Sequence, residues 1–353
     1  MLKNSLALAL LAVCFGPINA QQSRPRKLPI IDMHMHARTA AHYGPPPQPM
    51  CAPVDRMPLW DPKEPWLDAL SKSEVCKNPV WSPKTDEEVM RQTIAVMERY
   101  NIFGMLGGKP ELVAKWMASA PGRFIPGLDF RLDRATGTGT AVSQGGEYKP
   151  MSPDEMRALH KKGGFTVLGE VLNQYGGIAP DDERMGPYWA LAEELDIPVG
   201  IHIGGGGPGE VYLGNEKFRA RLQSALTLEE VLVRHPKLRL YIMHAGYPLL
   251  DDLLALLFNY PQVYVEVSVI NNVEPRPAFY RYLRAIMDGG YGERVMFGSD
   301  QMVWPGVIEP AIKSIQQAPF LTRKQKRDIF YNNAARFLRL SPEEITRHHR
   351  GGG

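Results

Sequence analysis

The chain has 353 residues, of which 44% are hydrophobic and 22% charged, a balance typical of a soluble globular protein with a large core. This length allows one large domain or two ordinary ones. The formal net charge of +3 is close to neutral for a chain of this size. Proteins that hold a nucleic acid or an anionic membrane by charge carry a basic excess, so we expect neither as a partner.

Residues 1–20 have the pattern of a signal peptide. Lys3 precedes an apolar run at residues 6–15, and small residues follow up to Ala20, after which we expect cleavage and export of the chain. The run is too short to span a bilayer as a helix of the mature protein, so no stable membrane insertion is expected. A lipid anchor at Cys14 is the less favoured alternative, because Val13 is bulky where lipoprotein cleavage sites usually have a small residue.

The first predicted strand covers residues 30–36 and is followed by a long Pro-rich insertion at 39–83. Its many prolines exclude a regular helix. Trp60, Trp66 and Trp81 favour a packed cover over a disordered segment. Cys51 and Cys76 lie inside the insertion, and a disulfide and two free thiols are both compatible with the sequence.

From residue 85 onwards, amphipathic helices alternate with short apolar strands. We expect the further strands at 102–106, 124–129, 165–171, 197–203, 238–244, 263–269 and 295–297. Eight strands, each followed by a helix, predict a parallel sheet closed as a (β/α)8 TIM barrel over residues 21–340, with a flexible tail at 341–353. An open doubly wound sheet is the second choice. A dinucleotide-binding fold is disfavoured, because Gly204–Gly207 are followed by Pro208 and not by a GxGxxG helix.

Six polar residues stand at or near the carboxyl ends of these strands. They are His34 and His36 of the first strand, Glu170 of the fourth, His202 of the fifth, His244 of the sixth and Asp300 after the eighth. The carboxyl ends of barrel strands share one rim, where active sites lie. Imidazole and carboxylate groups are ligands of divalent metals. We therefore expect a metal site at this rim.

The remaining histidines receive a structural interpretation. His160, His235, His348 and His349 lie at helix ends or in the predicted tail, where a hydrogen-bonded structural histidine is the common case. His42 follows the first strand closely and is left as a residue that could line a pocket.

The order of these motifs resembles the amidohydrolase superfamily, and most of all its amidohydrolase-related branch, which contains the aminocarboxymuconate-semialdehyde-type decarboxylases. The resemblance is carried by the His34/His36 pair, His202, His244 and Asp300. It implies a (β/α)8 enzyme in which His34, His36, His202 and Asp300 bind a divalent metal, most often zinc, with manganese as an alternative. His244 would be a further ligand, a base or an electrophile.

Glu170 departs from the decarboxylase-like pattern, which has no ligand from the fourth strand. Binuclear hydrolases of the superfamily carry a carboxylate there. If Glu170 is a ligand, two metal ions can share the site; if it pairs instead with Arg131 or Arg134, one ion is expected. We favour the ligand interpretation.

These features favour metal-dependent hydrolysis of an amide, ester or lactone in a small molecule. Asp300 would take a proton from a metal-activated water and pass it to the leaving group, and protonated His244 would polarise the scissile bond. A one-metal decarboxylase of an aromatic or unsaturated acid is the alternative, and a non-catalytic metal-binding protein is a third hypothesis. The sequence leaves the substrate and the oligomeric state open.

Loop residues after the strands are the candidates for substrate binding. The predicted set is Arg38, Asn173, Gln174, Tyr175 and Trp304, with Arg131, Glu266 and Gln301 as weaker candidates. Arg38 could hold a carboxylate or a phosphate, although a surface arginine is an equally good interpretation.

Overall fold

The computed structural model describes residues 27–72, 74–132 and 151–351. The predicted signal peptide with Cys14 and the candidate ion-pair partner Arg134 lie outside these residues. Eight parallel strands form one sheet in chain order. The strands are β1 (Ile30–Ala37), β4 (Ile102–Gly108), β5 (Phe124–Phe130), β6 (Val167–Val171), β7 (Val199–His202), β8 (Leu240–Met243), β9 (Tyr264–Glu266) and β10 (Val295–Met296).

Two backbone hydrogen bonds join the first strand to the segment after the last one. Met33 N–H donates to the Phe297 carbonyl at 2.9 Å, and Asp300 N–H donates to the His34 carbonyl at 2.8 Å. The sheet therefore curls into a barrel, and the predicted TIM-barrel fold is confirmed.

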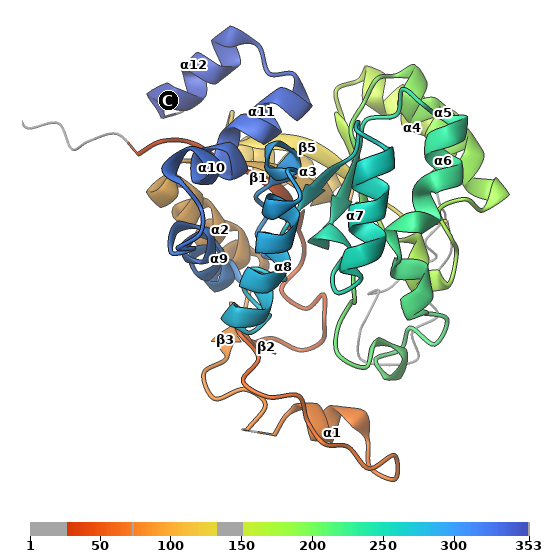
Figure 1. Cartoon of the computed structure of the whole chain (residues 1–353). Coiled ribbons are helices and arrows are strands. Elements are labelled where there is room, and N and C mark those ends of the chain that lie inside the picture. The colour runs from red at the N-terminus through yellow and green to blue at the C-terminus, as the bar shows by residue number, and fades with distance from the viewer. Residues whose placement is uncertain (1–26, 73, 133–150, 352–353) are drawn as a thin grey trace, which may run out of the picture.

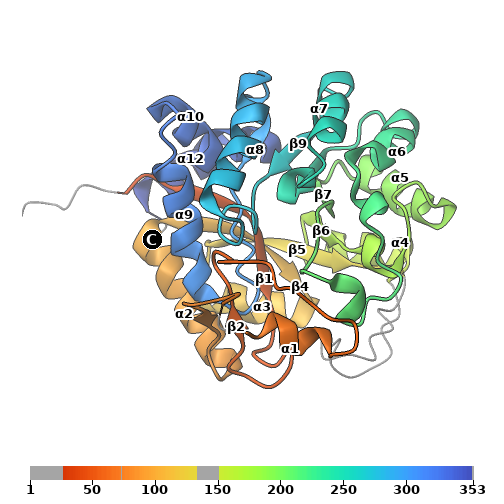
Figure 2. The ribbon, with the colours of Figure 1, turned by 60° about the horizontal axis from the view of Figure 1, so that its bottom comes forward.

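Helices surround the strands (Figures 1 and 2). They are α1 (Trp66–Leu70), α2 (Asp86–Tyr100), α3 (Pro110–Ser119), α4 (Pro153–Lys161), α5 (Gly186–Glu194), α6 (Glu229–Arg234), α7 (Leu250–Asn259), α8 (Arg276–Asp288), α9 (Ile308–Gln316), α10 (Arg323–Arg327), α11 (Asn333–Leu338) and α12 (Pro342–Arg350). A π-helical turn at Asp328–Asn332 connects α10 to α11.

Local sequence signals explain several helix boundaries. The Thr85 hydroxyl accepts a hydrogen bond from Glu88 N–H at the start of α2, and Asn101 ends that helix in the left-handed conformation. Ser152 and Glu155 form a capping box at the start of α4, where Pro153 occupies the first turn.

An irregularity in β1 decides which of its side chains enter the barrel. The pairing register of β1 with β4 shifts between Asp32 and Met35. Met33 packs in the inner apolar cluster with Met105 and Tyr241, whereas Met35 packs in the cluster between strands and helices. A bulge of this kind changes the side-chain alternation along a strand. His34 lies within the irregularity and His36 two residues further on, and the two histidines consequently point into the barrel mouth together.

The insertion at 39–83 contains α1 and a short antiparallel pair, β2 (Pro49–Met50) and β3 (Val80–Trp81), and several of its large side chains are exposed, Leu59 and Trp81 among them. A disulfide joins Cys51 to Cys76. The insertion contacts the loops that follow the strands: Trp66 Nε1–H donates to the Pro208 carbonyl at 2.9 Å and Trp304 Nε1–H donates to the Gln48 carbonyl at 2.8 Å. It therefore lies at the same end of the barrel as the strand carboxyl ends.

The expectation of a flexible tail at 341–353 is wrong for the residues up to Gly351. Ser341 and Glu344 form a capping box that starts α12. The ring of His348 on this helix is buried and stacks on Phe103, with the ring centroids 3.7 Å apart. Burial of this ring fixes the helix at the end of the barrel opposite α1, β2 and β3 (Figure 1). Within the described residues, no helix combines the length and the apolar character that crossing a membrane requires.

Candidate metal centre

The six polar residues predicted at the rim come together at the barrel mouth. His34 and His36 lie in the second half of β1, Glu170 is the penultimate residue of β6, and His202 is the last residue of β7. His244 directly follows β8, and Asp300 comes four residues after β10. All six side chains are buried, none with more than 5% of its residue surface exposed. The parallel strands thus deliver them to one site, as the sequence predicts.

One half of the cluster consists of His34, His36 and Asp300. The Nε2 atoms of the two histidines are 3.0 Å apart. Asp300 Oδ1 lies 3.2 Å from His36 Nε2 and 3.7 Å from His34 Nε2. Three potential donor atoms therefore face one point.

The other half contains Glu170, His202 and His244. Glu170 Oε1 lies 2.7 Å from His202 Nδ1 and 3.5 Å from His244 Nε2. The second oxygen of the same carboxylate lies 3.4 Å from His36 Nε2 and 3.5 Å from His34 Nε2. Glu170 therefore touches both halves of the cluster.

Burial and charge act in opposite directions on these groups. Burial by itself raises the pKa of the Glu170 carboxyl, but His34, His202 and His244 outweigh it and hold that pKa well below its ordinary value. Burial likewise disfavours a charged Asp300, yet the two histidines of β1 lower its pKa. Burial lowers the pKa of His34, and Asp300 and Glu170 raise it by more. Two ionised carboxylates thus stand among the imidazoles, an arrangement that attracts a cation.

The donor set fits a divalent metal. A zinc ion held tetrahedrally about 2.0–2.1 Å from its ligands separates the ligand atoms by about 3.3 Å, close to the distances within both halves. Two triplets of donor atoms are compact enough for an ion, His34/Glu170/His244 and His34/His36/Asp300. The Asp300 Oδ1 atom is also buried without a hydrogen-bond partner. A buried carboxylate oxygen without a partner is costly, and a cation satisfies it.

Several supporting residues were not assigned to the site from the sequence. Asp129 Oδ2, from β5, lies 3.4 Å from His36 Nδ1, and its Oδ1 accepts a hydrogen bond from Glu170 N–H at 2.9 Å. A Cβ on Gly107 would lie 2.2 Å from that Oδ1, so the glycine leaves room for it. Asp32 Oδ1 accepts from the backbone N–H groups of His34 and Ser299. Asp129 is the last residue of a predicted strand, and this position could have assigned it to the site from the sequence.

Two of the weaker substrate candidates support the cluster instead. The Gln301 amide accepts from His36 N–H at 3.1 Å and donates to the His36 carbonyl at 2.7 Å. Glu266 is fully buried at the end of β9, 3.0 Å from His34 Nδ1. Carboxylates behind metal-binding histidines orient the rings. The backbone glycines after His202 also have a packing role, because a Cβ on Gly204 would lie 2.8 Å from the His244 Cβ.

Arg38 and Tyr175 lie next to the cluster of six polar residues. Arg38 Nη2 lies 3.3 Å from His36 Nδ1 and 3.8 Å from Asp129, and its Nη1 contacts His42 Nε2. Burial and this guanidinium lower the pKa of His42 to about 2, so His42 is neutral. The Tyr175 ring packs against His202, with centroids 4.7 Å apart.

The other three predicted substrate residues have different surroundings. Asn173 accepts a hydrogen bond from Leu132 N–H at 2.8 Å and contacts Met185, which gives it a structural role. Trp304 stacks on Tyr43 and holds the insertion. Gln174 is fully buried, and neither of its amide atoms has a hydrogen-bond partner.

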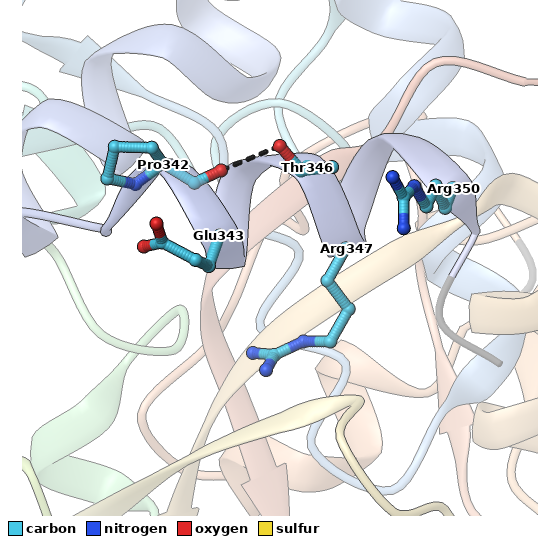
Figure 3. A pocket seen from close by; sticks show the side chains of 5 residues that line it. All are labelled: Pro342, Glu343, Thr346, Arg347 and Arg350. Atoms are coloured by element: carbon cyan, nitrogen blue, oxygen red, sulfur yellow. Dashed lines mark hydrogen bonds between the residues drawn. The ribbon is translucent and has the colours of Figure 1, made fainter.

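A surface hollow of about 580 Å³ lies far from this cluster, along α12 (Figure 3). It is lined by Pro342, Glu343, Thr346, Arg347 and Arg350. Because α12 is at the opposite end of the barrel, this hollow does not contribute to the metal centre.

Comparison with known proteins agrees with the geometry. A family model described as amidohydrolase matches residues 31–340. A search of curated proteins finds no match. Among solved structures, a probable 2-pyrone-4,6-dicarboxylic acid hydrolase from Acinetobacter baumannii is 15% identical, with a TM-score of 0.52 over 89% of this chain and 100% of that one. A 2,6-dihydroxybenzoate decarboxylase from Rhizobium is 14% identical, with a TM-score of 0.51 over 89% and 99% of the two chains.

A third structure, 4-oxalomesaconate hydratase from Rhodopseudomonas palustris, is 16% identical, with a TM-score of 0.51 over 91% of this chain and 99% of that one. At such identities the three likenesses show the barrel fold alone. The family match covers nearly the whole barrel and all six cluster residues. The chain therefore belongs to the amidohydrolase family, within the amidohydrolase-related superfamily of metal-dependent enzymes.

Proposed function

We propose that the protein is a metal-dependent hydrolase that cleaves an amide, ester or lactone bond in a small molecule. The observation that carries the proposal is the position of Glu170, whose two carboxylate oxygens contact the two halves of the cluster separately. A carboxylate in that position is suited to link two ligand groups. We expect one or two ions, with zinc favoured by the imidazole-rich donor set and manganese as the alternative.

The residues of the chain have distinct roles in this proposal. His34, His36, His202, Glu170 and Asp300 would hold the metal, which supplies Lewis acidity and lowers the pKa of a bound water. Asp300 is ionised and its Oδ1 faces the cluster, so it can accept the proton of the attacking water and later donate it to the leaving group. Arg38 and Tyr175 border the cluster and are the residues best placed to contact a substrate.

Decarboxylation of an aromatic or unsaturated acid is a second candidate, favoured by Arg38. Its guanidinium is mostly buried beside His36, and a fixed cation next to a metal centre suits a carboxylate on the substrate. This reaction requires only one metal ion.

Metal content and activity together test the proposal. The purified protein, reconstituted with zinc or manganese, is analysed for metal per chain and assayed on panels of esters, amides and lactones and of aromatic carboxylic acids. Hydrolysis that is lost in Asp300→Asn and retained in Ser314→Ala, whose hydroxyl lies within α9, supports the proposal. Release of CO₂ without hydrolysis by a protein with one ion per chain would establish the second candidate.

We also propose that the chain is exported. The leader-like pattern at residues 1–20 and the pairing of Cys51 with Cys76 support this, because stable disulfides form mainly in oxidising compartments. Expression of the full chain with a fractionation assay tests it, and retention of the uncleaved chain in the cytoplasm would contradict it.

A further inference from the structure

Ser268 lies behind the candidate metal site and contacts two of its histidines. This serine was not assigned to the site from the sequence. Its hydroxyl is 3.0 Å from His34 Nδ1 and 3.1 Å from His244 Nδ1. The same hydroxyl donates to Glu266 Oε1 at 2.8 Å, and Ser268 N–H donates to Glu266 Oε2 at 2.6 Å. Both Ser268 and Glu266 are fully buried, so water does not compete for these contacts.

A count of protons assigns the tautomers of the two imidazoles. A serine hydroxyl has one proton to donate and two lone pairs that accept. Its proton goes to Glu266 Oε1, and both oxygens of that carboxyl group also accept a backbone N–H, Oε1 from His244 and Oε2 from Ser268. The hydroxyl can then only accept from His34 and His244, so each of these rings carries its proton on Nδ1.

Two further contacts give the same assignment. His34 Nδ1 also lies 3.0 Å from Glu266 Oε1, an oxygen that accepts from the Ser268 hydroxyl and from His244 N–H. His244 Nδ1 also lies 3.3 Å from the Ser268 carbonyl, which likewise only accepts. In the neutral rings, the Nε2 atoms therefore have free lone pairs. The His34 Nε2 faces His36, and the His244 Nε2 faces His202 and Glu170.

We propose that Ser268 and Glu266 are positioning residues that hold His34 and His244 in the same tautomer through one shared hydroxyl. This inference rests on the metal centre of the proposed function and deepens it. His244 then presents its Nε2 to Glu170 and His202, and through this atom it can act as the ligand, base or electrophile expected from the sequence. The hydroxyl also couples the two rings, because both imidazoles contact the same oxygen atom. Rotation of either ring therefore breaks a contact with the hydroxyl that also holds the other ring.

The backbone is shaped to accept this pair. A Cβ on Gly298 would lie 2.2 Å from Glu266 Oε2 and 3.0 Å from the Ser268 Cβ, so only glycine fits beside them. Glu266 Oε1 also accepts from His244 N–H at 3.0 Å, which fixes the backbone that carries the second histidine. The carboxylate thus orients one ring directly and the other through its main chain.

The test compares Ser268→Ala with Ser314→Ala, which removes another fully buried hydroxyl, 2.6 Å from the Ala311 carbonyl in α9. Histidine-labelled protein is examined by ¹⁵N–¹H NMR, with His34→Gln and His244→Gln spectra for assignment. Zinc affinity is measured by competition with a chromogenic chelator. In the wild type we expect exchange-protected Nδ1–H signals from both histidines. In Ser268→Ala the His244 signal exchanges faster and zinc affinity falls about 10–100-fold.

Ser268→Thr, which keeps the hydroxyl, should restore most of the zinc affinity, and Ser314→Ala should behave as the wild type. An Nδ1 atom without a proton on either ring of the wild-type protein would overturn the proposal, as would a Ser268→Ala protein with wild-type exchange and zinc affinity. The NMR measurement is made with and without zinc. If the wild type does not bind zinc, the metal centre is contradicted, but the tautomers are still measured in the zinc-free sample. If the protein binds zinc but hydrolyses no substrate, only the proposed reaction is contradicted.

Discussion

The carboxylate of Glu170 lies 2.7 Å from His202 Nδ1, and this contact joins β6 to β7 at the centre of the candidate metal site. The same carboxylate reaches the β1 histidines through its other oxygen. Because Glu170 contacts both halves of the cluster, its replacement should weaken metal binding at both.

Glu170→Gln should lower zinc affinity by about 10–100-fold or more and, if the wild type binds two ions, reduce the stoichiometry to one. The amide keeps the shape of the side chain but loses the negative charge that stands among four imidazoles. Chelator competition and elemental analysis measure both quantities. Glu210→Gln is the matched control, because Glu210 is a buried glutamate that hydrogen-bonds within the loop after β7. Equal zinc affinity in the two variants would argue against Glu170 as a ligand.

Asp300→Asn should reduce turnover by at least about 100-fold while the protein still binds metal through its histidines. The amide cannot accept the proton of the attacking water, although it occupies the same volume. Steady-state kinetics on any substrate found in the panel, combined with metal analysis of the same sample, measures the effect. An Asp300→Asn protein that keeps wild-type turnover would remove the general-base role.

The pH dependence of stability should contain a contribution from His348 on α12. Burial, together with nearby Arg347, lowers the pKa of His348 to about 4, below the value of about 6.5 in the unfolded chain. Between these pH values the unfolded chain binds a proton that the folded protein does not. The contribution of His348 to the free energy of unfolding is therefore complete above pH 6.5 and falls as the pH is lowered towards 4.

His348→Gln should remove this contribution. Urea unfolding at pH 7 and at pH 4.5 should show a loss of stability on acidification that is about 1–2 kcal/mol larger in the wild type than in the variant. The remaining acid sensitivity is common to both proteins. An identical pH dependence in the two would show that His348 does not titrate as its buried position between Phe103 and Tyr331 implies.

Replacement of both Cys51 and Cys76 by serine should lower the free energy of unfolding by about 2–4 kcal/mol. The two residues are 25 positions apart, and a disulfide that closes such a loop restricts the unfolded chain. Thermal unfolding of wild type and variant, with and without a reductant, measures the effect. The reductant should destabilise only the wild type. Thiol labelling of the unreduced, denatured wild type checks the pairing, and labelling of Cys51 and Cys76 would contradict it.

The sequence by itself determined the barrel and most of the residues that gather at its mouth. Apolar strands that alternate with amphipathic helices predict a parallel sheet. Each helix connects one strand to the next parallel strand and covers a face of the sheet. Once the strands are parallel, residues at their carboxyl ends meet at one rim. His202, His244 and Asp300 could therefore be assigned to one site from their positions after three different strands.

Only the tertiary structure decided which side chains support that site. The β1 irregularity that lets Met33 and the two histidines all face inward is a matter of register with β4, which a single strand does not reveal. Ser268 and Glu266 contact histidines that come from two other strands. The spacing of residues within their own segment therefore does not predict these contacts. The tail was mispredicted for the same reason. His348 holds α12 by stacking on Phe103, a residue 245 positions earlier in the chain, and burial at such a distance is decided by packing alone.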